Sequence, residues 1–168
     1  MNQKAEDIYE QHAKTVYRYL FSLTSEADTA EELTQETFYQ ALKRMDTYRG
    51  ESSPQVWLCA IAKRLWFKEL ERRRRTAFLP EESLAGMAAP DRVEEDYETR
   101  ENRFALYRAI QQLDSDTREV IRLRLAGDFS FRDIGDILGQ SEVWARVRFY
   151  RGKEALARMM GGDKDEGK

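Results

Sequence analysis

Residues 130 to 156 read SFRDIGDILGQSEVWARVRFYRGKEAL and predict a helix, a three-residue turn and a second, longer helix. Ser130 and Asp133 form the Ser-x-x-Asp pattern of a capping box, which opens a helix whose apolar residues share one face. Gly139 ends that helix, because a residue that tolerates positive φ can turn the chain sharply at little steric cost. This pattern is typical of proteins that place the second helix in the major groove of DNA.

The second helix, from about Glu142 to Arg158, has two different faces. Spacings of four, three and four define a buried face at Ala145, Phe149, Gly152 and Leu156. The rest of the surface is cationic with one aromatic, and comprises Arg146, Val147, Arg148, Tyr150, Arg151 and Lys153. Such charges can be simply a solvated face, but the capped helix and the glycine turn before them favour a DNA reader.

The composition favours an all-helical protein with one domain or two small ones. Hydrophobic residues make up 41% and charged residues 35% of the 168, and there are only three prolines. No apolar run approaches the roughly 20 residues that span a bilayer, and the polar start of the chain does not resemble a signal peptide. We therefore expect a cytoplasmic protein with no stable membrane insertion.

The reactive residues argue against an enzyme. The single cysteine, Cys59, and the single histidine, His12, exclude an internal disulfide and disfavour a structural zinc site. Cys59 lies in an apolar segment and is predicted to be a core residue. Neither a glycine-rich phosphate loop nor a catalytic signature occurs. The sequence therefore predicts no catalytic residue, no metal and no cofactor.

The net charge of -3 hides an uneven distribution along the chain. Residues 63 to 75 hold seven basic and two acidic side chains, whereas residues 80 to 98 hold seven acidic and one basic. Phosphate affinity depends on the local patch rather than on the average charge. The chain thus carries two basic patches, here and in the C-terminal helix, separated by an acidic spacer.

The first 45 residues predict two helices. Residues 5 to 23 form an ordinary amphipathic helix, and Thr29 with Glu32 suggests a capping box that opens a second helix from about Ala30 to Met45. Its inward residues are predicted to be Leu33, Thr37, Ala41 and Leu42, with Phe38 beside them. Its other face is acidic and is either a solvated surface or a docking surface for a basic partner helix.

A third helix is predicted from Pro54 to about Arg75, with Ser53 as its N-cap and proline at its first position. It begins apolar and ends in four arginines, so its first half should pack in a domain while its second half projects cations. Trp66 and Phe67 lie among these cations, a mixture that suits unpaired bases and phosphates. Alternatively, the aromatics are core residues and the arginines a solubilising end.

Proline, glycine and small residues between Thr76 and Glu98 predict a flexible linker, followed by helices from about Arg92 to Gln112 and from Asp114 to Gly127. A free coil of about 20 residues spans on the order of 25 Å, which would let two modules reach separate sites. The predicted fold is all-α, with two small helical domains. They comprise residues 1–75 and 99–160, joined by the linker 76–98 and followed by a disordered tail, 161–168.

Two groups of residues, in matching order and spacing, resemble one known family. Residues 28 to 38, DTAEELTQETF, are similar to its D-A-E-D-L-V-Q-E-T-F segment, and Trp57-Leu58 with Ile61-Ala62-Lys63 stands in place of its W-L-x-x-I-A-R run. Its C-terminal pattern L-P-x-x-x-R-x-V…G-x-S-x-x-E-I-A…G-x-S-x-x-T-V-K-S-R-L-x-R-A-R is matched by Leu113, Arg118, Val120, Leu123, Gly127, Ser130, Ile134, Gly139, Ser141, Arg146, Arg148 and Arg151. The family is the extracytoplasmic-function (ECF) group of sigma-70 factors, small bacterial initiation factors of RNA polymerase.

The resemblance implies a sigma factor whose partners are core RNA polymerase and promoter DNA, with an anti-sigma protein as a further candidate. The residues that dock on the polymerase would be Glu31, Glu32, Leu33, Gln35, Glu36 and Phe38. The minus-ten strand would be engaged by Tyr48, Arg49, Lys63, Arg64, Lys68 and Arg72. The minus-thirty-five duplex would be read by Ser141, Glu142, Val143, Arg146, Val147, Arg148 and Arg151.

The chain departs from the family pattern at Arg64 and Lys68, where the family often has Asn and Asp, so its minus-ten contacts are expected to be unusual. Trp144 replaces a commoner Thr in the recognition helix. We expect Arg146 to carry duplex selectivity and Arg73 to contribute mainly affinity and its salt dependence. The alternative function is a stand-alone helix-turn-helix regulator, which leaves the acidic and basic helices unexplained.

Overall fold

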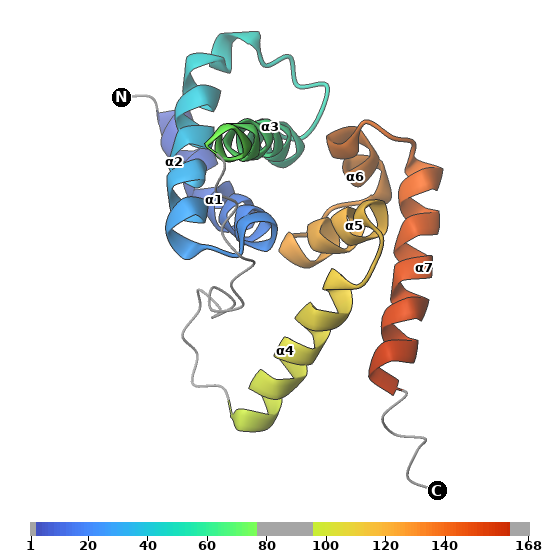
Figure 1. The fold of residues 1–168 in the computed structure, drawn as a ribbon. Helices are drawn as coiled ribbons and strands as arrows, with labels where there is room; N and C mark the ends of the chain where they lie inside the picture. Colours follow the sequence, from blue (N-terminus) through green and yellow to red (C-terminus); the bar gives the residue numbers. More distant parts are fainter. Residues whose placement is uncertain (1–2, 77–95, 162–168) are drawn as a thin grey trace, which may run out of the picture.

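The computed structural model describes residues 3–76 and 96–161, and within these two ranges helices are joined by turns and short loops, without a strand (Figure 1). The elements are α1 (Gln3–Thr24), α2 (Ala27–Lys43), the short 3-10 helix η1 (Met45–Thr47), α3 (Pro54–Arg75), α4 (Tyr97–Gln111), α5 (Ser115–Ala126), α6 (Phe131–Leu138) and α7 (Glu142–Gly161). The all-α prediction is confirmed.

The boundaries of the predicted linker and tail differ slightly from the structure. Tyr97 and Glu98 already lie in α4, because Asp96 caps that helix by accepting a hydrogen bond from the Thr99 amide at 2.7 Å. Gly161 is the last residue of α7. The remainder of the predicted linker from residue 77, the predicted helix start near residue 92 and the predicted tail from residue 162 lie outside the described residues.

Most helix starts follow the local sequence. Ser53 accepts a hydrogen bond from the Val56 amide at 3.3 Å, with Pro54 in the first turn. Ser130 and Asp133 exchange two hydrogen bonds of 3.0 Å, one from each backbone amide to the other's side chain, which confirms the capping box.

The capping box predicted at Thr29 is wrong. Helix α2 already begins at Ala27, and Thr29 lies inside it, where its hydroxyl donates to the Glu26 carboxylate at 2.5 Å. Helix α1 ends in a tight turn, and α2 begins directly after it. The position of this turn, and not the local Thr-x-x-Glu pattern, therefore sets the start of α2.

Helices α1, α2 and α3 pack on one another as a three-helix bundle, and α7 packs along α4, α5 and α6. The second half has a small core of its own, formed by Ile110, Leu113 and Ile121 under the side chains of α7. The two halves also share one hydrophobic cluster, which includes Leu20, Leu58, Leu123 and Ile134. Each half is therefore built as a separate helical unit, but the units are packed together.

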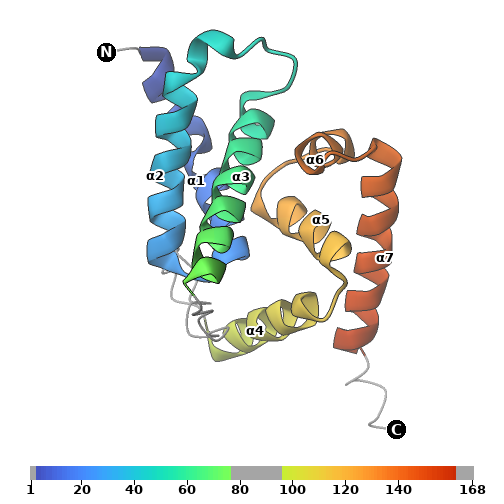
Figure 2. The ribbon, with the colours of Figure 1, turned by 45° about the horizontal axis from the view of Figure 1, so that its top comes forward.

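The two units meet where α1 packs against α5 and α3 packs against α6, an arrangement visible in both ribbon views (Figures 1 and 2). We call this contact the seam. Tyr19 of α1 is fully buried there and its hydroxyl donates to Glu119 of α5 at 3.4 Å. Cys59 is fully buried beside Tyr19, and burial raises the pKa of its thiol to about 12.

Gly127, in the connection from α5 to α6, allows the closest approach across the seam. A Cβ atom at this position would lie 2.8 Å from Cγ2 of Thr15 and 2.7 Å from Nε2 of Gln55, which belong to α1 and α3. Phe129 follows and is 1% exposed. The predicted modules are therefore not independent in this structure, because a surface of the second is buried on the first.

Candidate polymerase and DNA interfaces

The acidic face of α2 presents most of the residues predicted to dock on the polymerase. Glu31, Glu32 and Gln35 are exposed, and Glu36, half-buried, accepts a hydrogen bond from Gln40 at 2.8 Å. Leu33 is half-buried against the core. These side chains form one surface because they recur at helical spacing on a helix packed by its other side.

Phe38 does not belong to that surface. It is buried, and its ring makes an edge contact with Tyr9 of α1 at a centroid distance of 4.9 Å. Conversely, Leu42, predicted to face inward, is 50% exposed, as is Tyr39 at 52%, with Lys43 lying 4.4 Å above its ring. Phe38 and Leu42 lie one turn apart on the same side of α2 and both line a hollow beside Tyr9 of α1, so their exposure differs with position along the helix and not with the face.

The loop before α3 is held in place by aromatic packing. Tyr48 stacks on Trp57 of α3 with ring centroids 4.7 Å apart, and its hydroxyl donates to the backbone carbonyl of Ser52. Burial of the ring raises the pKa of Tyr48. Arg49 is exposed at the start of the loop. The loop therefore lies against the first turn of α3, next to the basic helix face.

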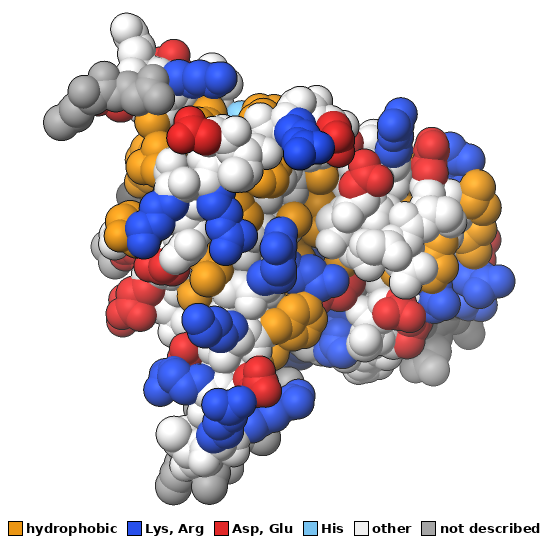
Figure 3. Space-filling model, turned by 90° about the horizontal axis from the view of Figure 1, so that it is seen from above, with side chains coloured by type: hydrophobic (Ala, Val, Ile, Leu, Met, Phe, Trp, Pro, Cys, Tyr) orange, Lys and Arg blue, Asp and Glu red, His pale blue; other side chains and the backbone are white. Residues whose placement is uncertain are grey.

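That face of α3 carries the other residues predicted for the minus-ten strand. Arg64 and Lys68 are exposed, Lys63 is half-buried, and Arg72 has 66% of its side chain exposed while it pairs with Glu69 at 2.7 Å. Viewed from above, lysine and arginine side chains follow α3 towards its C-terminal end, with hydrophobic side chains between them (Figure 3). The face is thus cationic, as the charge distribution predicted.

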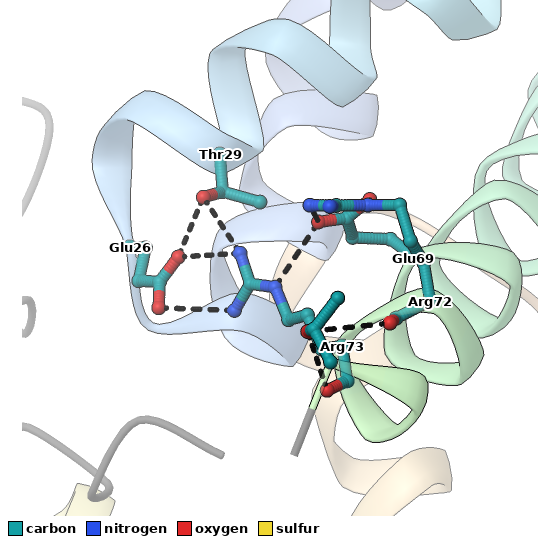
Figure 4. Close-up of polar contacts among 6 residues, drawn as sticks. Glu26, Thr29, Glu69, Arg72 and Arg73 are labelled. Atoms are coloured by element: carbon teal, nitrogen blue, oxygen red, sulfur yellow. Dashed lines mark hydrogen bonds and ion pairs between the residues drawn. The ribbon is translucent and has the colours of Figure 1, made fainter. Parts of the chain in front are cut away.

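Arg73 is not part of this cationic face. Its guanidinium points towards α2, where it donates to Glu26 at 3.0 Å and to Thr29 at 3.2 Å, and it also pairs with Glu69 at 3.1 Å (Figure 4). Only 18% of its side chain is exposed. The structure thus places Arg73 away from the surface for which phosphate contacts were predicted, since the residue ties the end of α3 to the start of α2.

The ion pairs around Arg73 also lower the pKa values of the two acids that they include. Hydrogen bonds from Arg72 and Arg73 lower the pKa of Glu69 to about 2, and the hydrogen bond from Arg73 lowers the pKa of Glu26. The guanidinium also lies 5.5 Å from the centroid of the buried Trp66 ring. Trp66 consequently belongs to the core, whereas its neighbour Phe67 is 51% exposed.

The helix-turn-helix forms as predicted. Gly139 has φ of 69°, in the left-handed region that favours glycine, and ends α6. The Ser141 hydroxyl accepts a hydrogen bond from the Trp144 amide at 3.0 Å and so caps α7. Ala145 and Gly152 are buried, and a Cβ atom on Gly152 would lie 2.7 Å from Cγ2 of Thr117, so α7 packs closely on α5.

The outward face of α7 contains most of the residues predicted to read the duplex. Ser141, Glu142, Val143, Arg146, Val147 and Arg151 are all exposed. Arg146 pairs with Glu142 at 3.1 Å in an exposed contact that costs little to break. Tyr150, on the same helix and 53% exposed, extends this face. Tyr150 lies three positions after Val147, and this helical spacing in the sequence already indicates that both residues share one face.

Arg148 lies apart from that face. It pairs with Asp114 at 3.3 Å and with Asp116 at 3.9 Å at the start of α5, and only 29% of its side chain is exposed. It also lies 5.3 Å from the centroid of the Trp144 ring, which packs against the shared hydrophobic cluster. Trp144 is therefore a packing residue of this cluster, and the Arg148 guanidinium covers its ring.

The fold and these surfaces define a two-unit helical protein with a helix-turn-helix, a second cationic helix and an acidic helix face. Within the described ranges, no helix is long and apolar enough to cross a membrane.

Comparison with known proteins agrees with this class. Residues 8–76 match the family described as Sigma-70 region 2, and residues 103–156 match Sigma-70, region 4. The RNA polymerase sigma factor CarQ of Myxococcus xanthus is 32% identical over 159 residues, which cover 93% of this chain and 88% of CarQ. The RNA polymerase sigma factor YlaC of Bacillus subtilis is 27% identical over 164 residues, covering 96% of this chain and 94% of YlaC.

A solved structure has the same fold. The sigma factor RpoE of Bartonella quintana, in complex with the anti-sigma factor NepR, superposes with a TM-score of 0.77 at 21% identity, covering 95% of this chain and 98% of RpoE. The chain therefore belongs to the sigma-70 family of RNA polymerase sigma factors, in its ECF group. It is a factor that directs promoter-specific transcription initiation, and such factors are in general DNA-binding proteins without enzymatic activity.

Proposed function

We propose a division of labour between the two units of this sigma factor. Residues 1–75 dock on core RNA polymerase and capture the minus-ten strand, residues 99–160 read the minus-thirty-five duplex, and residues 76–98 connect them. Residues 77–95 lie outside the described ranges. The observation that carries this proposal is the outward face of α7, which is exposed and cationic on a helix whose other side is packed.

The docking surface on α2 consists of Glu31, Glu32, Leu33, Gln35 and Glu36, together with the exposed Tyr39 and Leu42. An acidic surface with aliphatic and aromatic residues at its border suits a basic amphipathic helix of the polymerase. Phe38 supports this surface from the core. The minus-ten surface comprises Tyr48, Arg49, Lys63, Arg64, Lys68 and Arg72, whose exposed cations suit the phosphates of a single strand.

Engagement of both promoter elements requires the seam to open. The names of the minus-ten and minus-thirty-five elements place them about 25 base pairs apart, which corresponds to about 85 Å at 3.4 Å per base pair. A compact chain of this length has a radius of gyration of about 15 Å. We infer that the packed arrangement is the unbound form, and that docking on the polymerase separates α1 and α3 from α5 and α6.

An anti-sigma protein is the partner that we propose for the unbound state. RpoE of Bartonella quintana was solved in complex with the anti-sigma factor NepR. We further propose that the chain has no enzymatic activity of its own and acts in the cytoplasm, where its polymerase is found.

Run-off transcription tests the proposal. Core polymerase with this protein should initiate at specific promoters selected from a template library, whereas core polymerase alone should not. If no template gives specific initiation, the division of labour is wrong, and binding of the free protein to an operator would then favour the stand-alone regulator.

A matched pair of variants tests the reading face. Arg146→Ala should weaken discrimination at one position of the minus-thirty-five element by about 1 to 3 kcal/mol, as expected for loss of an arginine contact to guanine. Arg148→Ala should leave that discrimination intact, because Arg148 is held by Asp114 and Asp116. Equal loss of selectivity in both variants would contradict the assignment of the reading face.

A further inference from the structure

Phe67 is an exposed aromatic ring that the fold does not use. It is 51% exposed, whereas the next residue towards the N-terminus, Trp66, is buried, and Trp57 of the same helix is stacked on Tyr48. Isolated exposed apolar residues are common and need no explanation. The surroundings of Phe67, however, are those of a nucleic-acid contact.

Three cations surround the ring. Lys63, one turn before Phe67, places its amine 5.4 Å from the ring centroid. Arg64, three positions before Phe67, is exposed on the same face of α3, and Lys68 is exposed at the adjacent position along the helix. Along α3 the ion pairs begin only at Glu69, within the described part of the chain, and Glu71, one turn after Phe67, is paired with Arg75 at 3.3 Å. The ring therefore lies beside the half-buried Lys63 and the exposed Arg64 and Lys68.

We propose that Phe67 stacks on one unpaired base of the non-template strand, with Lys63 and Lys68 holding the adjacent phosphates. Stacking on aromatic rings beside a cationic groove is how proteins hold single strands. The proposal deepens the proposed function, since it rests on α3 as the minus-ten surface and names the residue that contacts a base. Duplex DNA does not offer a base face to the ring, so the contact exists only after strands separate.

Single-strand binding by the holoenzyme tests this proposal. The probe is a fluorescein-labelled 20-nucleotide single strand of mixed sequence, and anisotropy is compared with that of core polymerase alone. Phe67→Ala should weaken binding roughly 5- to 100-fold, the range measured for loss of one base stack. Phe67→Tyr should restore binding, because it retains the ring.

Tyr97→Ala is the matched control, because Tyr97 is an aromatic residue that is 78% exposed and belongs to α4, outside the proposed strand-binding surface. Its affinity should equal that of the wild type, and all variants should melt at the wild-type temperature. Equal binding by Phe67→Ala and the wild type would overturn the proposal, as would a loss that Phe67→Tyr does not restore.

An abasic scan locates the base and separates the two proposals. On the strand whose contacted base is missing, the wild type and Phe67→Ala should bind equally, whereas they should differ on the other abasic strands. A uniform difference on all strands would overturn base stacking. Failure of the wild type to initiate at any promoter would count against the proposed function instead, while the single-strand comparison would still decide the role of Phe67.

Discussion

The four arginines that end α3 have different roles although their sequence is uniform. Arg72 and Arg75 are exposed and pair with Glu69 and Glu71 on their own helix. Arg73 turns inward and joins Glu26, the residue before α2 and 47 positions earlier in the chain. A run of identical residues does not reveal which member faces the neighbouring helix, because that depends on where the helix crosses its neighbour.

Arg73→Ala should destabilise the N-terminal unit. The substitution removes the charged donor of the partly buried Glu26 and one of the two charged donors of Glu69, which keeps Arg72, so the free energy of unfolding should fall by about 2 kcal/mol. For a chain of this size the melting temperature should fall by roughly 4 to 8 °C. Arg75→Ala, at a pair with both side chains more than two-thirds exposed, should change it little. Equal melting temperatures in the two variants would contradict this role for Arg73.

The stabilisation by Arg73 should depend on pH. The pKa of Glu69 falls from an ordinary 4.5 to about 2 on folding, and that of Glu26 is also lowered. A lowered acid pKa stabilises the fold above the unfolded value, and this contribution is lost as pH falls from about 4.5 towards 2. Urea unfolding should therefore show a constant difference between the wild type and Arg73→Ala from pH 7 to about pH 5, and that difference should shrink as the pH falls from about 4.5 towards 2. A difference that stays constant over this lower range as well would exclude the carboxylates as its source.

At the scale of elements, the capping box of α6 offers a direct test of local sequence control. Ser130→Ala removes the side-chain acceptor for the Asp133 amide and should lower the free energy of unfolding by about 1 kcal/mol. Ser130→Asp keeps an acceptor at this position and should retain most of the stability. Thermal unfolding of both variants distinguishes loss of the cap from a general intolerance of substitution at residue 130.

Helix ends that depend on a few neighbouring residues were predictable from the sequence. Ser53 with Pro54, Ser130 with Asp133, and Gly139 each act through their own backbone, so their signals are local. The predictions failed where a distant helix decides. Thr29 is not a cap because α2 already begins after Glu26, and Leu42 is exposed while Phe38, one turn earlier on the same side of α2, is buried against Tyr9 of α1.

The candidate site was predictable to a similar extent. The cationic and acidic helix faces follow from composition and period, and the family resemblance assigned them to DNA and polymerase. Arg148 could not be separated from Arg146, because its partner Asp114 lies 34 residues away. Phe67 could not be separated from Trp66 for the same reason, since adjacent residues differ in exposure only through tertiary packing.

At the scale of the whole molecule, the seam controls whether the two DNA-reading surfaces can separate. Gly127→Leu should wedge it open, because even a Cβ atom would meet Thr15 and Gln55 within 2.8 Å. X-ray scattering should then show a larger radius of gyration than the wild type. Gly161→Leu is the control, since a Cβ atom there meets nothing within 4 Å. An unchanged radius for Gly127→Leu would mean that the seam repacks around the new side chain.

The buried thiol of Cys59 can report how often the structure opens. Cys59 is the only cysteine in the sequence, it is fully buried next to Tyr19, and its thiol has a pKa near 12, so it can form the reactive thiolate and meet a thiol reagent only when the structure around it opens. The rate at which a colorimetric reagent labels the native protein therefore measures how often the structure opens around Cys59, without any substitution in the chain. A ligand that holds the two units together should slow the labelling.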